Sequence, residues 1–151
     1  YFERELVNGN CGEGDSNYGK VDIFKYSSST DSFNSIGEIY GGDLDGIEDC
    51  DSFSRSFGGS SIALSDDGTI LAVAAEYAED FAGAIFIFQY LSDAWTLKYK
   101  LAGDDSFTGS SSIGFANTLS LSADGMTLAT GSYKAESGKG EVKVYNLTEI
   151  F

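Results

Sequence analysis

The chain has 151 residues, 42% hydrophobic and 14% aromatic, which is enough for a folded core and argues against intrinsic disorder. Its 24 acidic and 9 basic residues give a net charge of −15, which disfavours binding to nucleic acid and to anionic membrane surfaces. It has no histidine, which excludes Ser-His-Asp and Cys-His catalysis and histidine-ligated zinc. No apolar run approaches the about 20 residues that span a bilayer, so membrane insertion is not expected.

The first third of the chain predicts two antiparallel strands. Residues 1–6 form a weak strand pattern, and residues 7–18 form a Gly- and Asn-rich loop that carries Cys11. Runs rich in β-branched and aromatic residues follow at 19–26 and 32–40, separated by a polar turn, as in a strand pair. Both runs match later runs of the chain, so this part is predicted to be the second half of a repeated unit.

The central segment, from Phe57 to Leu101, contains the most complete unit. Asp67-Gly68 between two apolar runs predicts a hairpin, because a tight turn needs residues that tolerate positive φ. The runs at 70–75 and 84–88 are almost wholly apolar, so we expect both of their faces to be buried.

The last run of this unit alternates between apolar and polar residues. We expect an apolar face with Trp95, Leu97, Tyr99 and Leu101, in which Trp95 belongs to the core. Thr96, Lys98 and Lys100 would then form a wet face whose lysines discourage edge-to-edge pairing.

The last third repeats the central unit at a constant spacing. Gly125 follows Gly68 by 57 positions (125 − 68), and Gly140 follows Gly83 by the same 57 (140 − 83). Repeats of about this length are typical of propeller blades. The sequence therefore predicts an all-β, β-propeller-like fold of about two and a half four-stranded antiparallel blades. We expect residues 1–151 to form one domain with a partial blade at 1–43, a complete blade at 57–104 and a partial blade at 114–151.

The central unit resembles a known repeat family. Its Phe57-Gly58 pair, the Ser-x-Asp-Gly sequence ending at Gly68 and the Leu-Ala-Val run from Leu71 resemble FG-GAP repeats of the integrin-α-like β-propeller superfamily. The third copy departs from the pattern, because Phe115-Ala116 replaces the Phe-Gly pair. The resemblance implies a propeller that serves adhesion, assembly or ligand display, generally without catalysis.

The resemblance also bears on calcium binding. The calcium loop of such repeats is replaced in the central unit by the hairpin at Asp67-Gly68, but an acidic stretch with similar spacing lies before it, at Asp43, Asp45 and Asp49. Carboxylate oxygens at such spacing suit Ca²⁺. A calcium site and a solvated acidic linker are the two alternatives for this stretch.

Two further features favour a secreted or cell-surface protein. Cys11 and Cys50 lie in polar loops, which predicts a disulfide and an oxidising compartment, with two free thiols as the alternative. Asn146-Leu147-Thr148 is an N-glycosylation sequon at a strand end. Because the chain starts on Tyr1 rather than Met, we expect a processed form or a piece of a longer protein.

The function expected from these observations is that of a non-catalytic structural or interaction module acting in assembly or adhesion. The alternatives are a calcium-dependent or lectin-like ligand-binding domain and a fragment of a propeller hydrolase. Two and a half blades cannot close a ring, so we expect other protein, either further chain or another copy, to complete the module, as in a filament or other large assembly.

The repeat also predicts how its units stack. Phe86 corresponds to Asp22 in the first copy and to Lys143 in the third. An apolar residue flanked by charges at equivalent positions predicts that the central unit lies between the other two.

Overall fold

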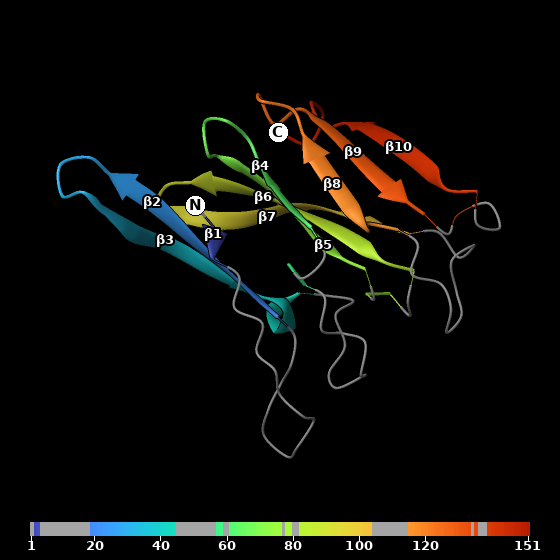
Figure 1. The fold of residues 1–151 in the computed structure, drawn as a ribbon, viewed down its shortest axis with the longest axis horizontal. Coiled ribbons are helices and arrows are strands. Elements are labelled where there is room, and N and C mark those ends of the chain that lie inside the picture. Colours follow the sequence, from blue (N-terminus) through green and yellow to red (C-terminus); the bar gives the residue numbers. More distant parts are fainter. Residues whose placement is uncertain are drawn as a thin grey trace, which may run out of the picture.

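The computed structural model describes residues 2–3, 19–44, 57–58, 61–76, 78–79, 82–103, 115–133, 135 and 139–151. Within these residues the fold is all-β, as predicted: ten strands form three antiparallel sheets, and one short 3-10 helix, η1 (Gly41–Asp43), follows the third strand. The three sheets succeed one another along the long axis of the molecule in the order of the sequence (Figure 1).

The first sheet has the order β1-β2-β3, with β1 (Phe2–Glu3), β2 (Lys20–Ser27) and β3 (Ser32–Tyr40). The expected pair of strands is confirmed as β2 and β3, joined by the polar turn between them. The weak strand pattern at the start of the chain corresponds to β1, which pairs with the other side of β2.

The central sheet has four strands in sequence order: β4 (Ile62–Leu64), β5 (Ile70–Ala75), β6 (Ala84–Leu91) and β7 (Ala94–Ala102). The hairpin predicted at Asp67-Gly68 joins β4 to β5, and Gly68 takes a φ of +73° there. All six residues of β5 and the first five of β6 are buried, which confirms that these two strands are covered on both faces.

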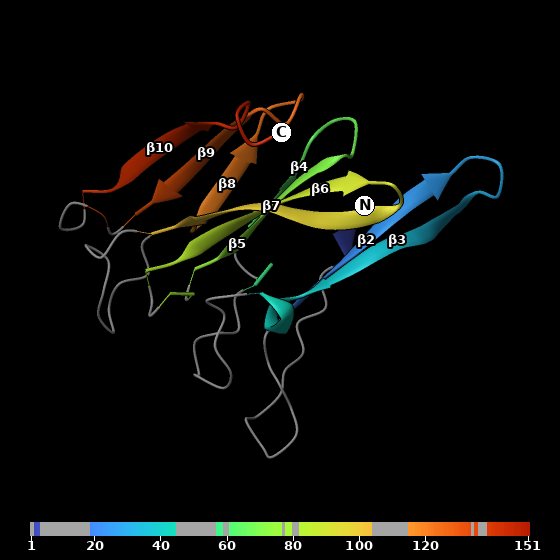
Figure 2. The ribbon, with the colours of Figure 1, turned by 180° about the vertical axis from the view of Figure 1, so that it is seen from behind.

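The third sheet repeats the first three strands of the central one, with β8 (Thr118–Leu121), β9 (Thr127–Ser132) and β10 (Glu141–Asn146) in the order β10-β9-β8. Within the described residues no fourth strand pairs with β10, which therefore forms an edge of this sheet. Figure 2, the view from behind, shows β10 at the end of the molecule farthest from β2 and β3.

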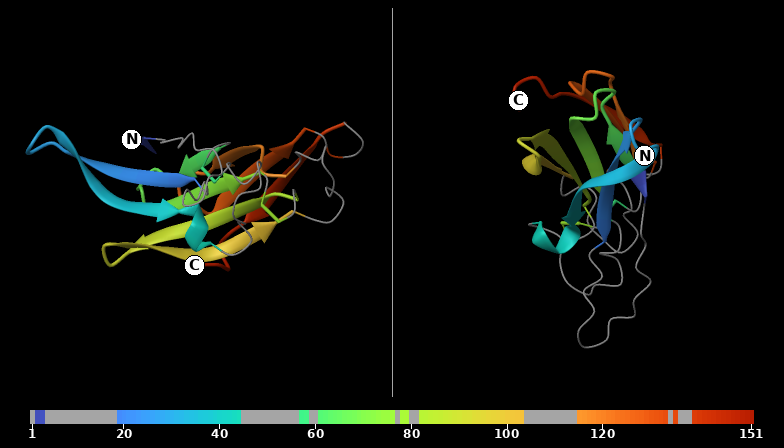
Figure 3. Two further views of the ribbon diagram at one scale, coloured as in Figure 1. Left: turned by 90° about the horizontal axis from the view of Figure 1, so that it is seen from below. Right: turned by 90° about the vertical axis from the view of Figure 1, so that its left-hand side faces the viewer.

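The central sheet lies between two separate hydrophobic cores. One core joins it to the first sheet through Val21 and Phe86, and the other joins it to the third sheet through Ile85 and Leu128. The Phe86 side chain is 0% exposed, whereas the side chain of Lys143, its counterpart in the third sheet, is 31% exposed. The predicted position of the central unit between the other two is confirmed, and Figure 3 shows the layering from two more sides.

The expectation that Trp95, Leu97, Tyr99 and Leu101 share one face of the last strand is wrong. Trp95 packs on the core shared with the first sheet, and Leu101 packs on the core shared with the third. A register shift midway along the β6–β7 pair leaves one extra residue on β7, and this β-bulge reverses the alternation of side chains. The β2–β3 pair has a bulge at the corresponding point.

Candidate functional site

The contact between the first and central sheets depends on the Phe57-Gly58 turn. A methyl group added at Gly19, just before β2, would lie 2.6 Å from the backbone oxygen of Phe57. The Phe57 ring is buried and meets the Phe86 ring edge-on at a centroid distance of 5.7 Å. A methyl group at Gly58 would likewise lie 2.6 Å from the side chain of Val21. The backbone of this turn is thus packed directly on the start of β2.

The contact between the central and third sheets repeats this arrangement. A methyl group added at Gly83, just before β6, would lie 2.7 Å from the backbone oxygen of Phe115. Phe115 and Ala116 are both buried in the core that joins these two sheets. Ala116 takes a φ of +64°, close to the +68° of Gly58, so the third copy keeps the turn conformation although it lacks the glycine. Phe57-Gly58 and Phe115-Ala116 are each called here a Phe turn. In both contacts the Phe turn of one sheet packs on the start of a strand in the preceding sheet.

Three hydrogen bonds extend the contact between the central and third sheets. The backbone N–H of Leu119 donates to the Ser61 hydroxyl at 3.0 Å, and the Asn117 amide donates to the Glu76 carboxylate at 3.1 Å. At the hairpin end, the backbone N–H of Asp66 donates to the Ala123 carbonyl at 2.9 Å. The neighbouring sheets are therefore joined by polar contacts at both ends of the apolar core.

The third sheet has a second face, which carries Val142 and Val144 and is called here the outer face. These valines are 72% and 66% exposed, whereas Ile85 and Ile87, the residues 57 positions earlier, are 0% exposed beneath the third sheet. The outer face thus presents the same apolar positions that the central sheet uses for contact.

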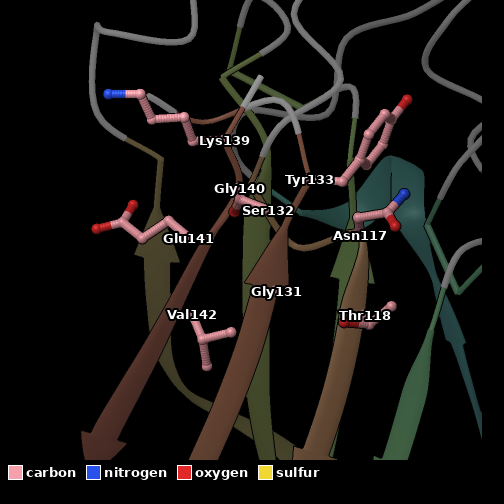
Figure 4. A pocket seen from close by; sticks show the side chains of 9 residues that line it. All are labelled: Asn117, Thr118, Gly131, Ser132, Tyr133, Lys139, Gly140, Glu141 and Val142. Atoms are coloured by element: carbon pink, nitrogen blue, oxygen red, sulfur yellow. The ribbon is translucent and has the colours of Figure 1, made fainter. Parts of the chain in front are cut away.

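An open depression of about 420 Å³ lies at one end of the outer face. Figure 4 shows how Thr118, Gly131 and Val142 line it from three adjacent strands, with Gly140 above them. Among the described residues, the atoms nearest to a methyl group built on Gly140 belong to Ser132 and Tyr133 and lie at least 3.7 Å away.

The opposite end of the molecule carries charged groups beside exposed aromatic side chains. On the side of the first sheet that faces away from the central one, the ammonium group of Lys20 lies 3.0 Å from a carboxylate oxygen of Asp22 and 4.0 Å from one of Glu38. The same ammonium lies 5.8 Å from the centroid of the Tyr40 ring. The two ends of the three-sheet stack therefore differ in chemistry.

The hairpins of the central and third sheets share one hydrogen-bond pattern. The Ser65 hydroxyl donates to Asp67 at 2.7 Å, and Ser122 donates to Asp124 at 2.6 Å. These bonds, with a backbone N–H that each carboxylate also accepts, hold the pKa of both Asp side chains below the usual value. The carboxylate of Asp67 also accepts the Thr69 hydroxyl, so it serves to stabilise the turn.

The predicted calcium and disulfide residues are only partly within the described chain. Asp43 ends η1 and is exposed, whereas Asp45 and Asp49 lie outside the described residues. Cys11 and Cys50 also lie outside them, so their pairing stays a prediction. Among the residues that are described, no group of three or more acidic, cysteine or histidine side chains could hold a metal ion.

The sequon residue Asn146 is exposed at the end of β10. Its side-chain oxygen accepts hydrogen bonds from the backbone N–H of Thr148 at 3.0 Å and from the Thr148 hydroxyl at 2.8 Å. Both bonds use Oδ1, so they orient the amide without engaging its nitrogen. The geometry is compatible with attachment of a glycan.

The outer face is the candidate feature that the sequence analysis does not predict. Its signal was present, because Val142 and Val144 stand 57 positions after Ile85 and Ile87. Comparing only Phe86 with Lys143 revealed the charged positions of the third sheet and overlooked the apolar ones on either side.

No protein-family model matches the chain, and no curated protein sequence matches it. Among the residues with described structure, no helix is long and apolar enough to cross a membrane.

Proposed function

We propose that this chain is a non-catalytic structural and interaction module of a secreted or cell-surface protein, built from FG-GAP-like repeats that stack as propeller blades. The observation that carries the proposal is the repeated contact between successive sheets. The Phe57 turn packs on Gly19, and the Phe115 turn packs on Gly83, at almost equal distances of 2.6 and 2.7 Å. The sheets therefore follow one another by one packing rule, which is how repeated blades are expected to stack.

The chemistry of the described residues supports a role in association. Among the described residues, the third sheet ends on the edge strand β10, which carries two valines that are more than half exposed. Sheet edges and exposed apolar surfaces of this kind are typical of sites where another polypeptide binds. The net charge of −15 keeps such a module soluble and favours cationic or neutral partners over nucleic acid.

The mass of the protein in solution tests this function. We expect sedimentation at micromolar concentration to give a species heavier than the 16.1 kDa chain, formed with other copies or with a partner chain. A well-folded monomer that binds no other protein would contradict an assembly role.

A further inference from the structure

We propose that the outer face of the third sheet is a docking site for one further repeat of the same kind, whose Phe-Gly or Phe-Ala turn packs over Gly140. This inference rests on the proposed function and names the surface and the partner. Its first support is that Gly140 is the third member of a series with Gly19 and Gly83. Each glycine directly precedes the strand that corresponds to the third strand of the central sheet, namely β2, β6 or β10. Their φ angles are +81°, +83° and +79°.

The first two glycines of the series are covered in the same way. The carbonyl oxygen of Phe57 lies where a side chain at Gly19 would be, and the carbonyl oxygen of Phe115 lies where a side chain at Gly83 would be. Each Phe turn is followed by the strands of its own sheet, so the sheet is fixed against its predecessor through this point. At Gly140 the described residues leave this place open, beside the depression of about 420 Å³.

The apolar part of the outer face matches the part of the central sheet that is already in use. Val142 and Val144 take the positions of Ile85 and Ile87, which are fully buried against the third sheet. They point to the same side of the sheet as Gly131, which is paired with Val142 and corresponds to Ala74. Small and β-branched residues at these positions form a flat surface, which suits the packing of another sheet.

The polar part of the outer face also has its counterpart. Ser61 of the central sheet accepts the backbone N–H of Leu119 at 3.0 Å, and Thr118, which is exposed beside the depression, stands 57 positions later. The Thr118 hydroxyl can accept the corresponding N–H of a docked strand. Within the described residues, the outer face therefore offers the three elements of the existing contact: a glycine that nothing covers, an apolar pair and a hydroxyl acceptor.

A second intact copy is not the occupant that this geometry favours. In each copy the Phe57 turn is packed on its own Gly19 and the Phe115 turn on its own Gly83. The end that a second copy would present is the first sheet, whose outward side carries the Lys20–Asp22 ion pair beside Tyr40 and offers no available Phe turn among the described residues. The site therefore requires a repeat whose Phe turn is still available.

An extended chain tests the docking site. Residues 95–151 are duplicated directly after Phe151, so that every appended residue stands 57 positions after its original and Phe115 recurs at the required distance. The tether gives the added repeat a high effective concentration. Val142→Cys serves as the probe, because a thiol at this exposed position reacts with a soluble alkylating reagent, and peptide mass analysis separates it from Cys11 and Cys50.

We expect the extension to slow alkylation of the new thiol by at least about tenfold, which corresponds to about 1.4 kcal/mol of docking free energy. Two matched chains separate face docking from simple strand addition. An extension with residues 95–103 alone supplies a fourth strand without a Phe turn, and the thiol should stay reactive. In the full extension, Gly140→Ala places a methyl group where the turn carbonyl would lie and should restore rapid alkylation.

Equal reactivity of the thiol in the extended and unextended chains would overturn the inference, provided that slow amide exchange in β5 shows the original sheets to be folded. Protection that appears in the unextended chain as its concentration rises would also overturn it, because a second copy would then cover the face. A monomeric mass for the unextended chain contradicts the proposed assembly role but not the docking site. Failure of the proposed function and failure of this inference are therefore distinguishable.

Discussion

Alanine substitutions at Gly83 and Gly140 provide a matched test of the packing between sheets. The two glycines are repeat-related and have nearly equal φ angles, +83° and +79°. A left-handed backbone conformation costs an alanine about 1–2 kcal/mol, and this cost applies at both positions. At Gly83 the added methyl group also meets the backbone carbonyl of Phe115 at 2.7 Å, whereas at Gly140 the nearest atom among the described residues lies 3.7 Å away. Overpacking of this kind adds a cost of about 1–3 kcal/mol, as other insertions into a packed core do.

We therefore expect Gly140→Ala to lower the free energy of unfolding by about 1–2 kcal/mol and Gly83→Ala to lower it by about 2–5 kcal/mol. Urea unfolding followed by circular dichroism measures both, and a constant m-value would show that the change lies in stability. Gly19→Ala should behave like Gly83→Ala, since its methyl group would lie 2.6 Å from the Phe57 carbonyl. Equal losses at Gly83 and Gly140 in the monomeric chain would refute the argument that the Phe turn is packed directly on the preceding strand.

Two other substitutions test the structure, and one measurement tests the disulfide predicted from the sequence. Thr130→Val should raise the free energy of unfolding by about 1 kcal/mol in thermal or urea unfolding, because the buried Thr130 hydroxyl has no hydrogen-bond partner among the described residues and Val73 fills the same place in the central sheet. A loss of stability would show that the hydroxyl is satisfied. Asp67→Asn should lower the free energy of unfolding at neutral pH, because a carboxylate with a lowered pKa stabilises the fold while it is ionised. The difference in unfolding free energy between the variant and the wild type should shrink as the pH falls below about 3.8, and a pH-independent difference would argue against this role. For the disulfide between Cys11 and Cys50, reduction should raise the intact mass by two hydrogens and lower stability by about 2–4 kcal/mol, whereas alkylation of both thiols without reduction would exclude it.

The strands could be predicted from the sequence because each is marked locally. The apolar runs that form β5 and β6 are bounded by turn residues, and the spacing from Gly68 to Gly125 is enough to locate the third sheet along the chain. The position of the central sheet also follows from a single comparison, that of Phe86 with its charged counterparts. These inferences succeed because they rest on patterns of period two and on repetition, which are local properties of the chain.

The features that could not be predicted depend on how backbones meet across sheets. The bulge that separates Trp95 from Leu101 arises in the pairing of two strands, and nothing in the alternating sequence of β7 marks the extra residue. The approach of the Phe115 carbonyl to Gly83 is similarly invisible, because a glycine before a strand is explained equally well by a turn. Only when the corresponding glycines are compared in three dimensions does Gly140 become distinct from the other two.

The order of the packing contacts has a consequence for how the protein forms during synthesis. Gly19 precedes the Phe57 turn that covers it, and Gly83 precedes the Phe115 turn, so each receiving strand leaves the ribosome before the turn that binds it. A newly made repeat therefore packs on a strand that has already been synthesised, and its packing contacts involve only the repeat just before it. Contacts between sequence neighbours keep the loop-closure entropy low, which favours folding in step with translation, from the N-terminus to the C-terminus.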